Sequence, residues 1–171
     1  DAGADDLNGN DGNDRLLGES GGDTIRGGNG NDIISDASGA NQLFGDAGND
    51  LFLAVASGSG VDSLAGGSGV DTYVVGTDLS QTFAIDRISD FEPAGDVINL
   101  AQVSSQLSGI AGGGNPLVTG HARFVQSGAD TLFEIDRDGS AGGASFVTVL
   151  RLLNVNASLL GPANLSLTPV S

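Results

Sequence analysis

Acidic residues recur at a fixed interval through the first half of the chain, each two positions after a glycine and two before an apolar residue. The interval is nine residues, with one three-residue insertion within 51–61. The repeated positions are Asp5, Asp14, Asp23, Asp32, Asn41, Asp50, Asp62 and Asp71. The apolar positions are Leu7, Leu16, Ile25, Ile34, Leu43, Phe52, Leu64 and Tyr73. Regularly spaced carboxylates with no Cys or His beside them favour a hard cation with oxygen ligands, Ca²⁺ rather than Zn²⁺ or Mg²⁺.

The repeat predicts the elements that position these carboxylates. Nine is not a helical period, and several glycines in each unit disfavour a helix. Three residues around each apolar position can form a short strand, and the glycine-rich residues before it a tight turn. Two units then complete one coil turn of eighteen residues, which stacks the acidic positions in two rows. The rows are Asp5, Asp23, Asn41, Asp62 and Asp14, Asp32, Asp50, Asp71.

Stacked carboxylates repel one another and require a counter-ion. A flexible, acidic, glycine-rich linker is the alternative, but a linker has no reason to keep its apolar residues in one register. The uncharged Asn41 should weaken the sites formed with Asp23 and Asp62. The insertion within 51–61 should also disturb the 41/62 and 50/71 pairs unless it bulges away from the coil. We therefore expect the tightest sites at 14/32 and 32/50.

Composition narrows the function further. The chain has 171 residues with 22 acidic residues and 6 basic ones, which gives a net charge of −16, and all the basic residues are Arg. Residues 1–78 hold 14 acids and 2 Arg, a net charge of −12, and residues 79–171 hold 8 acids and 4 Arg, a net charge of −4. Such a chain repels nucleic acid and anionic membranes. Cysteine is absent, and no apolar run approaches membrane-spanning length, so we expect neither disulfides nor stable membrane insertion. A monomer is expected.

The units at 27–35 and 66–74 resemble the RTX (repeats-in-toxin) nonapeptide, G-G-x-G-x-D-x-U-x. The resemblance implies an all-β fold in which residues 1–78 form a calcium-bound parallel β-roll that is largely unfolded without Ca²⁺. It also implies about four to six ions between turns, held by row carboxylates and loop carbonyls. The implied ligands are Asp5, Asn10, Gly12, Asp14, Gly21, Asp23, Gly27, Gly28, Gly30, Asp32, Asn41, Gly45, Asp46, Gly48, Asp50, Asp62, Gly66 and Asp71. Unit five begins Asp36-Ala37 and has Asn in place of Asp, and unit seven begins Ser57-Gly58, so both depart from the motif.

The period stops after Gly76, and the remaining sequence predicts antiparallel strands at 82–88, 97–100, 122–126, 131–135 and 146–155. Residues 86–100 resemble the D-x-I-x-D-F…D-x-I-x-L element that follows RTX repeats in type I-secreted proteases of the serralysin type and in RTX adhesins. Residues 131–139 with 146–155 resemble the last hairpin of the same target domains. The resemblance implies that residues 79–171 form a β-rich capping domain with an uncleaved secretion signal. That signal would be read by an ABC transporter with its membrane-fusion protein and outer-membrane channel. The protein would then be extracellular or on the cell surface, exported without an N-terminal signal peptide.

Several acidic residues outside the repeats have two interpretations. Asp90 and Asp96 either join a calcium site at the end of the roll or serve as turn and cap residues. Asp136 and Asp138 begin a D-x-D-G pattern, which is either a calcium loop or a plain turn. His121 has no acidic or hydroxyl partner nearby in the sequence, and no nucleophile with a base is evident, so we expect no enzyme activity.

Two functions remain. The leading hypothesis is a non-enzymatic, calcium-folded module and secretion signal of a large bacterial secreted or surface protein, an adhesin. The alternative is a carbohydrate-binding accessory module of an RTX-bearing polysaccharide-modifying enzyme, against which the net charge and the lack of an aromatic platform both argue. The outward residues of the even-numbered units are the more apolar, so residues 79–171 should pack on that sheet near Leu51 and Leu53.

Overall fold

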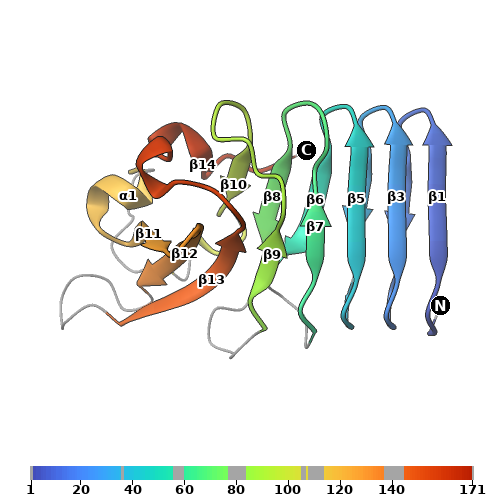
Figure 1. Ribbon diagram of the computed structural model, residues 1–171, viewed down its shortest axis with the longest axis horizontal. Coiled ribbons are helices and arrows are strands. Elements are labelled where there is room, and N and C mark those ends of the chain that lie inside the picture. The colour runs from blue at the N-terminus through green and yellow to red at the C-terminus, as the bar shows by residue number, and fades with distance from the viewer. Residues whose placement is uncertain are drawn as a thin grey trace.

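The computed structural model describes residues 2–35, 37–55, 60–76, 84–104, 107, 114–136 and 145–170. Its strands lie side by side along the long axis of the molecule, with the N-terminal strand at one end and a C-terminal hairpin at the other (Figure 1). They form an eight-stranded sheet in the order β1-β3-β5-β7-β9-β13-β12-β11 and a six-stranded sheet in the order β14-β10-β8-β6-β4-β2. None of the described helices is long and apolar enough to cross a membrane.

The repeats build the first part of both sheets. Odd-numbered units supply β1 (Asp6–Asp11), β3 (Thr24–Asn29), β5 (Gln42–Ala47) and β7 (Ser63–Ala65). Even-numbered units supply β2 (Arg15–Leu17), β4 (Ile33–Ser35), β6 (Leu51–Val55) and β8 (Thr72–Val75). Neighbouring strands in each sheet are parallel, and Leu7 pairs with Ile25 as Leu16 pairs with Ile34. The eighteen-residue coil turn predicted from the repeat is therefore confirmed.

The apolar residue at the centre of each unit points between the two sheets. Ile25, Ile34, Leu43, Phe52, Leu64 and Tyr73 are all buried and belong to one continuous core. Their strand neighbours face outward, because successive side chains of a strand alternate between its two faces. The rings of Phe52 and Tyr73 stack with their centroids 5.0 Å apart.

The insertion within 51–61 leaves the starts of the following strands in register. Gln42 on β5 pairs with Ser63 on β7, and Leu51 on β6 pairs with Thr72 on β8, as the eighteen-residue register continued past the insertion requires. Farther along β6 the register with β8 shifts between Phe52 and Val55, next to residues 56–59, which lie outside the described residues. The expected disturbance is therefore absent where the strands begin beside the 41/62 and 50/71 pairs, and it is present at the end of β6.

The second half continues both sheets before it changes character. Strand β9 (Asp86–Ile88) pairs in parallel with β7, and β10 (Val97–Asn99) pairs in parallel with β8. Beyond them, β11 (Ala122–Ser127), β12 (Asp130–Asp136) and β13 (Phe146–Leu152) form an antiparallel meander whose last strand runs parallel to β9. Strand β14 (Leu165–Ser166) pairs with β10. Short helical turns are α1 (Pro116–Thr119) and two 3-10 helices (Ala157–Leu159 and Pro162–Asn164).

One expectation for the second half needs correction. The described strands within the predicted ranges 82–88 and 97–100 are β9 and β10, and they are parallel additions to the roll rather than antiparallel strands, because each has an inward apolar residue that continues the core, Ile88 and Ile98. The described part of 79–171 joins the repeats end to end through strand pairing. Packing of this part on Leu51 and Leu53, which are half-buried, stays a prediction. The division into two domains at residue 78 stays a prediction.

Candidate metal centre

Hydrogen bonds connect the row aspartates of successive coil turns. In the row that contains Asp14, the backbone N–H of each aspartate donates to Oδ1 of the aspartate one turn later. The N···O distances are 2.8 Å from Asp14 to Asp32, 2.8 Å from Asp32 to Asp50 and 2.9 Å from Asp50 to Asp71. The row that contains Asp5 has the same ladder, with 2.8 Å from Asp5 to Asp23, from Asp23 to Asn41 and from Asn41 to Asp62. Both predicted rows therefore exist.

The second carboxylate oxygen of most row residues is buried and has no hydrogen-bond donor. These atoms are Oδ2 of Asp14, Asp23, Asp32, Asp50 and Asp71. A buried carboxylate oxygen without a donor is strongly unfavourable unless the group is protonated or a cation binds it. These oxygens therefore fit a row of bound cations.

The glycines of the loops bring backbone oxygens close to these carboxylates. A Cβ on Gly28 would overlap the carbonyl oxygen of Asn10, and a Cβ on Gly30 would overlap that of Gly12. Both glycines have positive φ, 107° and 132°, which residues with a side chain rarely adopt. The backbones of successive loops are thus in direct contact. The same arrangement recurs at Gly48, one turn after Gly30, and at Gly67, two turns after Gly28.

Three further glycines leave room beside the orphan oxygens. A Cβ on Gly27, Gly45 or Gly66 would overlap Oδ2 of Asp32, Asp50 or Asp71, respectively. In the described residues, no three side chains of His, Cys, Asp or Glu converge as a metal cluster. A cation in these rows must therefore take many of its ligands from the backbone. Mixed carboxylate and carbonyl oxygens suit Ca²⁺, which accepts six to eight oxygen ligands in flexible geometry.

Asn41 places an uncharged amide in a row that otherwise consists of carboxylates. Its side-chain Nδ2 donates to Oδ1 of Asp62 at 3.0 Å, so an N–H group faces the carboxylate of the next turn. The arrangement supports the expectation that the 41/62 position binds cations weakly. The relative affinities of the sites stay a prediction.

Both rows continue into the second half of the chain. The N–H of Asp62 donates to Oδ1 of Asp86 at 2.9 Å, and the N–H of Asp71 donates to Oδ1 of Asp96 at 3.0 Å. Sequence analysis missed Asp86 as a row residue because its unit lacks the glycine and lies 24 residues after Asp62. One sequence pattern could have identified Asp86 and Asp96 as row residues. In both cases the aspartate stands two positions before an inward apolar residue, Ile88 or Ile98.

Asp90 and Asp96 close the last loops of the roll. Oδ1 and Oδ2 of Asp90 accept hydrogen bonds from the N–H groups of Gly66 at 3.0 Å and Gly67 at 2.9 Å. Oδ2 of Asp96 accepts from the N–H of Glu92 at 2.8 Å. These contacts are those of turn and cap residues. Any additional role of the two carboxylates as calcium ligands stays a prediction.

The carboxylates near this end of the roll resist ionisation. Burial, together with the negative charges of Asp96, Asp50 and Asp90, raises the pKa of Asp71 to about 6. Burial also raises the pKa values of Asp50, Asp62 and Asp96. The Tyr73 hydroxyl is buried beside them without a hydrogen-bond partner, and burial raises the pKa of Tyr73 well above its usual range. A bound cation would reverse this effect for the carboxylates because it stabilises their charged form.

The remaining candidate residues lie in the C-terminal meander. Asp136 ends β12 and is buried, whereas Asp138 lies outside the described residues. His121 is also buried, and its Nδ1 lies 2.8 Å from the Thr119 hydroxyl. The expectation that His121 has no hydroxyl partner nearby in the sequence is therefore wrong, because the turn at Gly120 brings Thr119, two positions earlier, against the imidazole.

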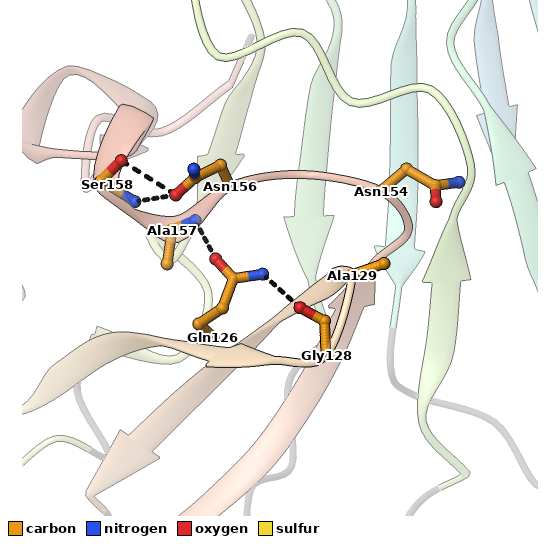
Figure 2. Close-up of a pocket in the computed structure, with 7 residues that line it drawn as sticks. All are labelled: Gln126, Gly128, Ala129, Asn154, Asn156, Ala157 and Ser158. Carbon is orange, nitrogen blue, oxygen red and sulfur yellow. Dashed lines mark hydrogen bonds between the residues drawn. The ribbon is translucent and has the colours of Figure 1, made fainter.

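A polar cavity of about 580 Å³ lies between the turn after β11 and the segment after β13 (Figure 2). The side-chain amides of Gln126 and Asn156 in this cavity form hydrogen bonds within the protein. Gln126 accepts a hydrogen bond from the N–H of Ala157 at 2.8 Å and donates to the carbonyl of Gly128 at 3.2 Å. Asn156 Oδ1 accepts from the N–H and hydroxyl of Ser158. These groups hold the segment in place, and we assign the cavity no ligand.

A family comparison identifies the repeats. Residues 1–34, 17–52 and 55–78 match the family model described as the RTX calcium-binding nonapeptide repeat, in four copies. The chain carries RTX calcium-binding repeats. The family resemblance inferred from the sequence is thereby confirmed, and the RTX repeats supply the calcium-binding chemistry that the two rows require. The secretion target domain remains a prediction.

Two solved structures are similar to the whole RTX-bearing chain. The AlgE6R3 subunit of the Azotobacter vinelandii mannuronan C5-epimerase is 27% identical with a TM-score of 0.56, over 91% of this chain and 80% of that one. The AlgE6R2 subunit of the same epimerase is 25% identical with a TM-score of 0.51, over 99% and 94%. The predicted all-β, parallel β-roll fold is confirmed by these similarities. A comparison with curated protein sequences finds no match.

Proposed function

We propose that this RTX chain is a calcium-folded, non-catalytic accessory module that binds an anionic polysaccharide for a larger polysaccharide-modifying enzyme. Its similarity to two subunits of a mannuronan epimerase over nine-tenths or more of its length supports the polysaccharide. This was the alternative hypothesis from the sequence, where net charge argued against it. The distribution of charge in the structure weakens that objection.

The observation that carries the proposal is the position of the arginines. Arg87 on β9 and Arg151 on β13 are paired in register on adjacent parallel strands. Together they line a cleft of about 220 Å³ with Ile85, Leu132 and Thr148. Arg151 is only loosely paired with Asp130, at 3.8 Å between Nε and Oδ2. Guanidinium groups bind carboxylates in bidentate fashion, so two of them on neighbouring strands can hold a uronate chain.

The same sheet carries other described arginines. Arg26 on β3 faces outward, and its guanidinium lies 4.0 Å from the ring centre of Phe44. Arg123 lies on β11 of this sheet, whereas Arg15 lies on β2 of the six-stranded sheet. The row aspartates are at the turns between the sheets, where bound Ca²⁺ would neutralise them. Arg26 is paired with Asp46 at 3.3 Å and Arg123 with Glu134 at 2.7 Å, so the eight-stranded sheet offers a polyanion mainly the charges of Arg87 and Arg151.

Isothermal titration of the calcium-loaded chain with mannuronan oligomers tests the proposal. We expect the double variant Arg87→Gln/Arg151→Gln to lose about tenfold or more in affinity, because it removes both charge-assisted contacts. Arg15→Gln is the control, since it removes one positive charge from the other sheet and should leave the affinity almost unchanged. No binding by the unchanged chain, or equal losses in both variants, would overturn the proposal.

A second function, calcium-gated type I secretion, is supported by the sequence resemblance of residues 86–100 and 131–155. In a calcium-poor cytosol the acidic rows repel one another and keep the chain extended, as a narrow channel requires. In the calcium-rich medium Ca²⁺ binds only the folded chain and drives folding. This function would place the protein outside the cell or on its surface.

Fusion of the whole chain to a reporter tests the secretion proposal. We expect the reporter in the medium of cells that contain an ABC transporter, its membrane-fusion protein and the outer-membrane channel. Cells without the transporter are the control. Retention of the fusion in both strains would exclude the secretion signal but would leave the polysaccharide proposal unaffected.

A further inference from the structure

Asp136 is a buried carboxylate outside the RTX rows. It is the last residue of β12, and its exposed fraction is 1%. Its backbone is held on both sides, because its N–H donates to the carbonyl of His121 at 2.8 Å and it pairs with Phe146 on β13. Both of its carboxylate oxygens are buried and have no hydrogen-bond partner.

The row aspartates of the repeats also have buried carboxylate oxygens without a hydrogen-bond partner. The other described carboxylate oxygens that are buried without a partner are Oδ2 of Asp14, Asp23, Asp32, Asp50 and Asp71. All five belong to calcium-binding repeats, where a cation supplies the missing partner. In Asp23, Asp32, Asp50 and Asp71, Oδ1 already accepts a backbone hydrogen bond, whereas both oxygens of Asp136 are without a donor. A positive partner should therefore stabilise the buried carboxylate of Asp136 at least as much as it stabilises a row aspartate.

Among the residues that the structure describes, the nearby positive and polar groups do not meet this need. Arg123 binds Glu134, with 2.7 Å between Nη2 and Oε2, and lies over the ring of Phe146 at 3.7 Å. His121 directs Nδ1 to the Thr119 hydroxyl at 2.8 Å. Each of these groups has another partner, and the structure pairs none of them with Asp136.

We propose that Asp136 anchors a calcium ion at the end of β12, separate from the ions of the roll. Two free oxygens on one carboxylate allow bidentate coordination, which Ca²⁺ accepts and which leaves its other positions to water and main-chain oxygens. The antiparallel meander would then depend on calcium as the RTX rows do. This inference goes beyond the proposed function, because it concerns a site that neither polysaccharide binding nor secretion requires.

Calcium counting with the whole chain tests the site. In equilibrium dialysis we expect Asp136→Asn to bind one Ca²⁺ fewer per chain than the unchanged protein, since the amide has no charge and one acceptor oxygen. Glu134→Gln is the matched control, because Glu134 lies on the same strand but has partners in Arg123 and Thr148. This control should keep the full number of ions. An unchanged count in Asp136→Asn would overturn the proposal.

A second measurement covers the case in which Asp136→Asn does not fold. The chain contains no Trp, so Phe146→Trp places a unique sensitiser opposite Asp136. With Tb³⁺ added to this variant, excitation of Trp should produce terbium emission that Ca²⁺ displaces, and the emission should fall sharply in Phe146→Trp/Asp136→Asn. Absence of displaceable emission in Phe146→Trp, or full emission in a folded double variant, would overturn the site.

Discussion

The backbone N–H of Asp32 donates to Oδ1 of Asp50 at 2.8 Å, while Oδ2 of each residue is buried without a donor. Each carboxylate therefore joins two coil turns through one oxygen and presents the other to a cation. Stacking of the turns and binding of the ion use the same side chain. We therefore expect folding and calcium binding to be coupled in the roll.

Calcium should control the folding of the whole RTX chain. In chelator we expect little β signal by circular dichroism, because the rows bring buried negative charges together. Added Ca²⁺ should restore the signal cooperatively at about 10⁻⁴–10⁻³ M, and Mg²⁺ should replace it poorly. Full β content in chelator with an unchanged melting temperature would contradict this mechanism.

Asp32 should matter more to calcium binding than Asp62. Asp32→Ala removes a carboxylate from the middle of a complete row, and we expect the calcium midpoint for folding to rise about tenfold. Asp62→Ala changes a position that already faces the Asn41 amide, so the rise should be about twofold. Calcium titrations followed by circular dichroism compare the two variants. A larger effect in Asp62→Ala would show that the Asn41 position is not the weaker one.

Asn41→Asp should complete the weaker row. The variant replaces the Nδ2 donor with a second carboxylate oxygen between Asp23 and Asp62. We expect at least one additional bound Ca²⁺ by equilibrium dialysis, because the new carboxylate supplies the charge and the second acceptor oxygen that the Asn41 amide lacks. Asn49→Asp, on the exposed part of the other edge, is the control and should add no ion. An unchanged count in Asn41→Asp would contradict the prediction.

Protons should partly replace calcium. Burial raises the pKa of Asp71 to about 6 and also raises those of Asp50, Asp62 and Asp96, so the calcium-free folded state binds more protons than the unfolded chain. Stability without calcium should therefore rise as pH falls through about 6 and be lost as pH rises through it. Calcium-stripped protein should show more β signal at pH 5 than at pH 7. In calcium the midpoint should instead increase at pH 5, because protons compete with the ion. Less β signal at pH 5 than at pH 7 in the stripped protein would contradict this account.

Phe91 should couple the repeats to the second half. Its ring lies 5.9 Å from that of Tyr73, and it is buried in the core that both halves share. We expect Phe91→Ala to lower the free energy of unfolding in calcium by about 3 kcal/mol, with one transition in chemical denaturation. Phe44→Ala, on the outer face under Arg26, should cost about 1 kcal/mol. Two separate transitions would show that the halves unfold independently.

The sequence alone was sufficient for the repeated part of the fold. Each unit contains its own turn glycines, aspartate and inward apolar residue, so the strand positions, the eighteen-residue register and both rows follow from local rules applied many times. The pairing of Leu7 with Ile25 and the position of Asp32 one turn from Asp14 agree with that prediction. The calcium chemistry followed from the same residues, because hard oxygen ligands recur there without any His or Cys.

Tertiary structure alone decided the features for which no period exists. Asp86 and Asp96 extend the rows after intervals of 24 and 25 residues, so their places depend on which strands pair rather than on spacing. Arg87 and Arg151 lie far apart in the chain and meet only because β13 pairs with β9. Asp136 differs from an ordinary turn residue only in its burial and its lack of a partner. Burial and cross-strand contact depend on the elements that cover a residue, and a local pattern does not contain that information.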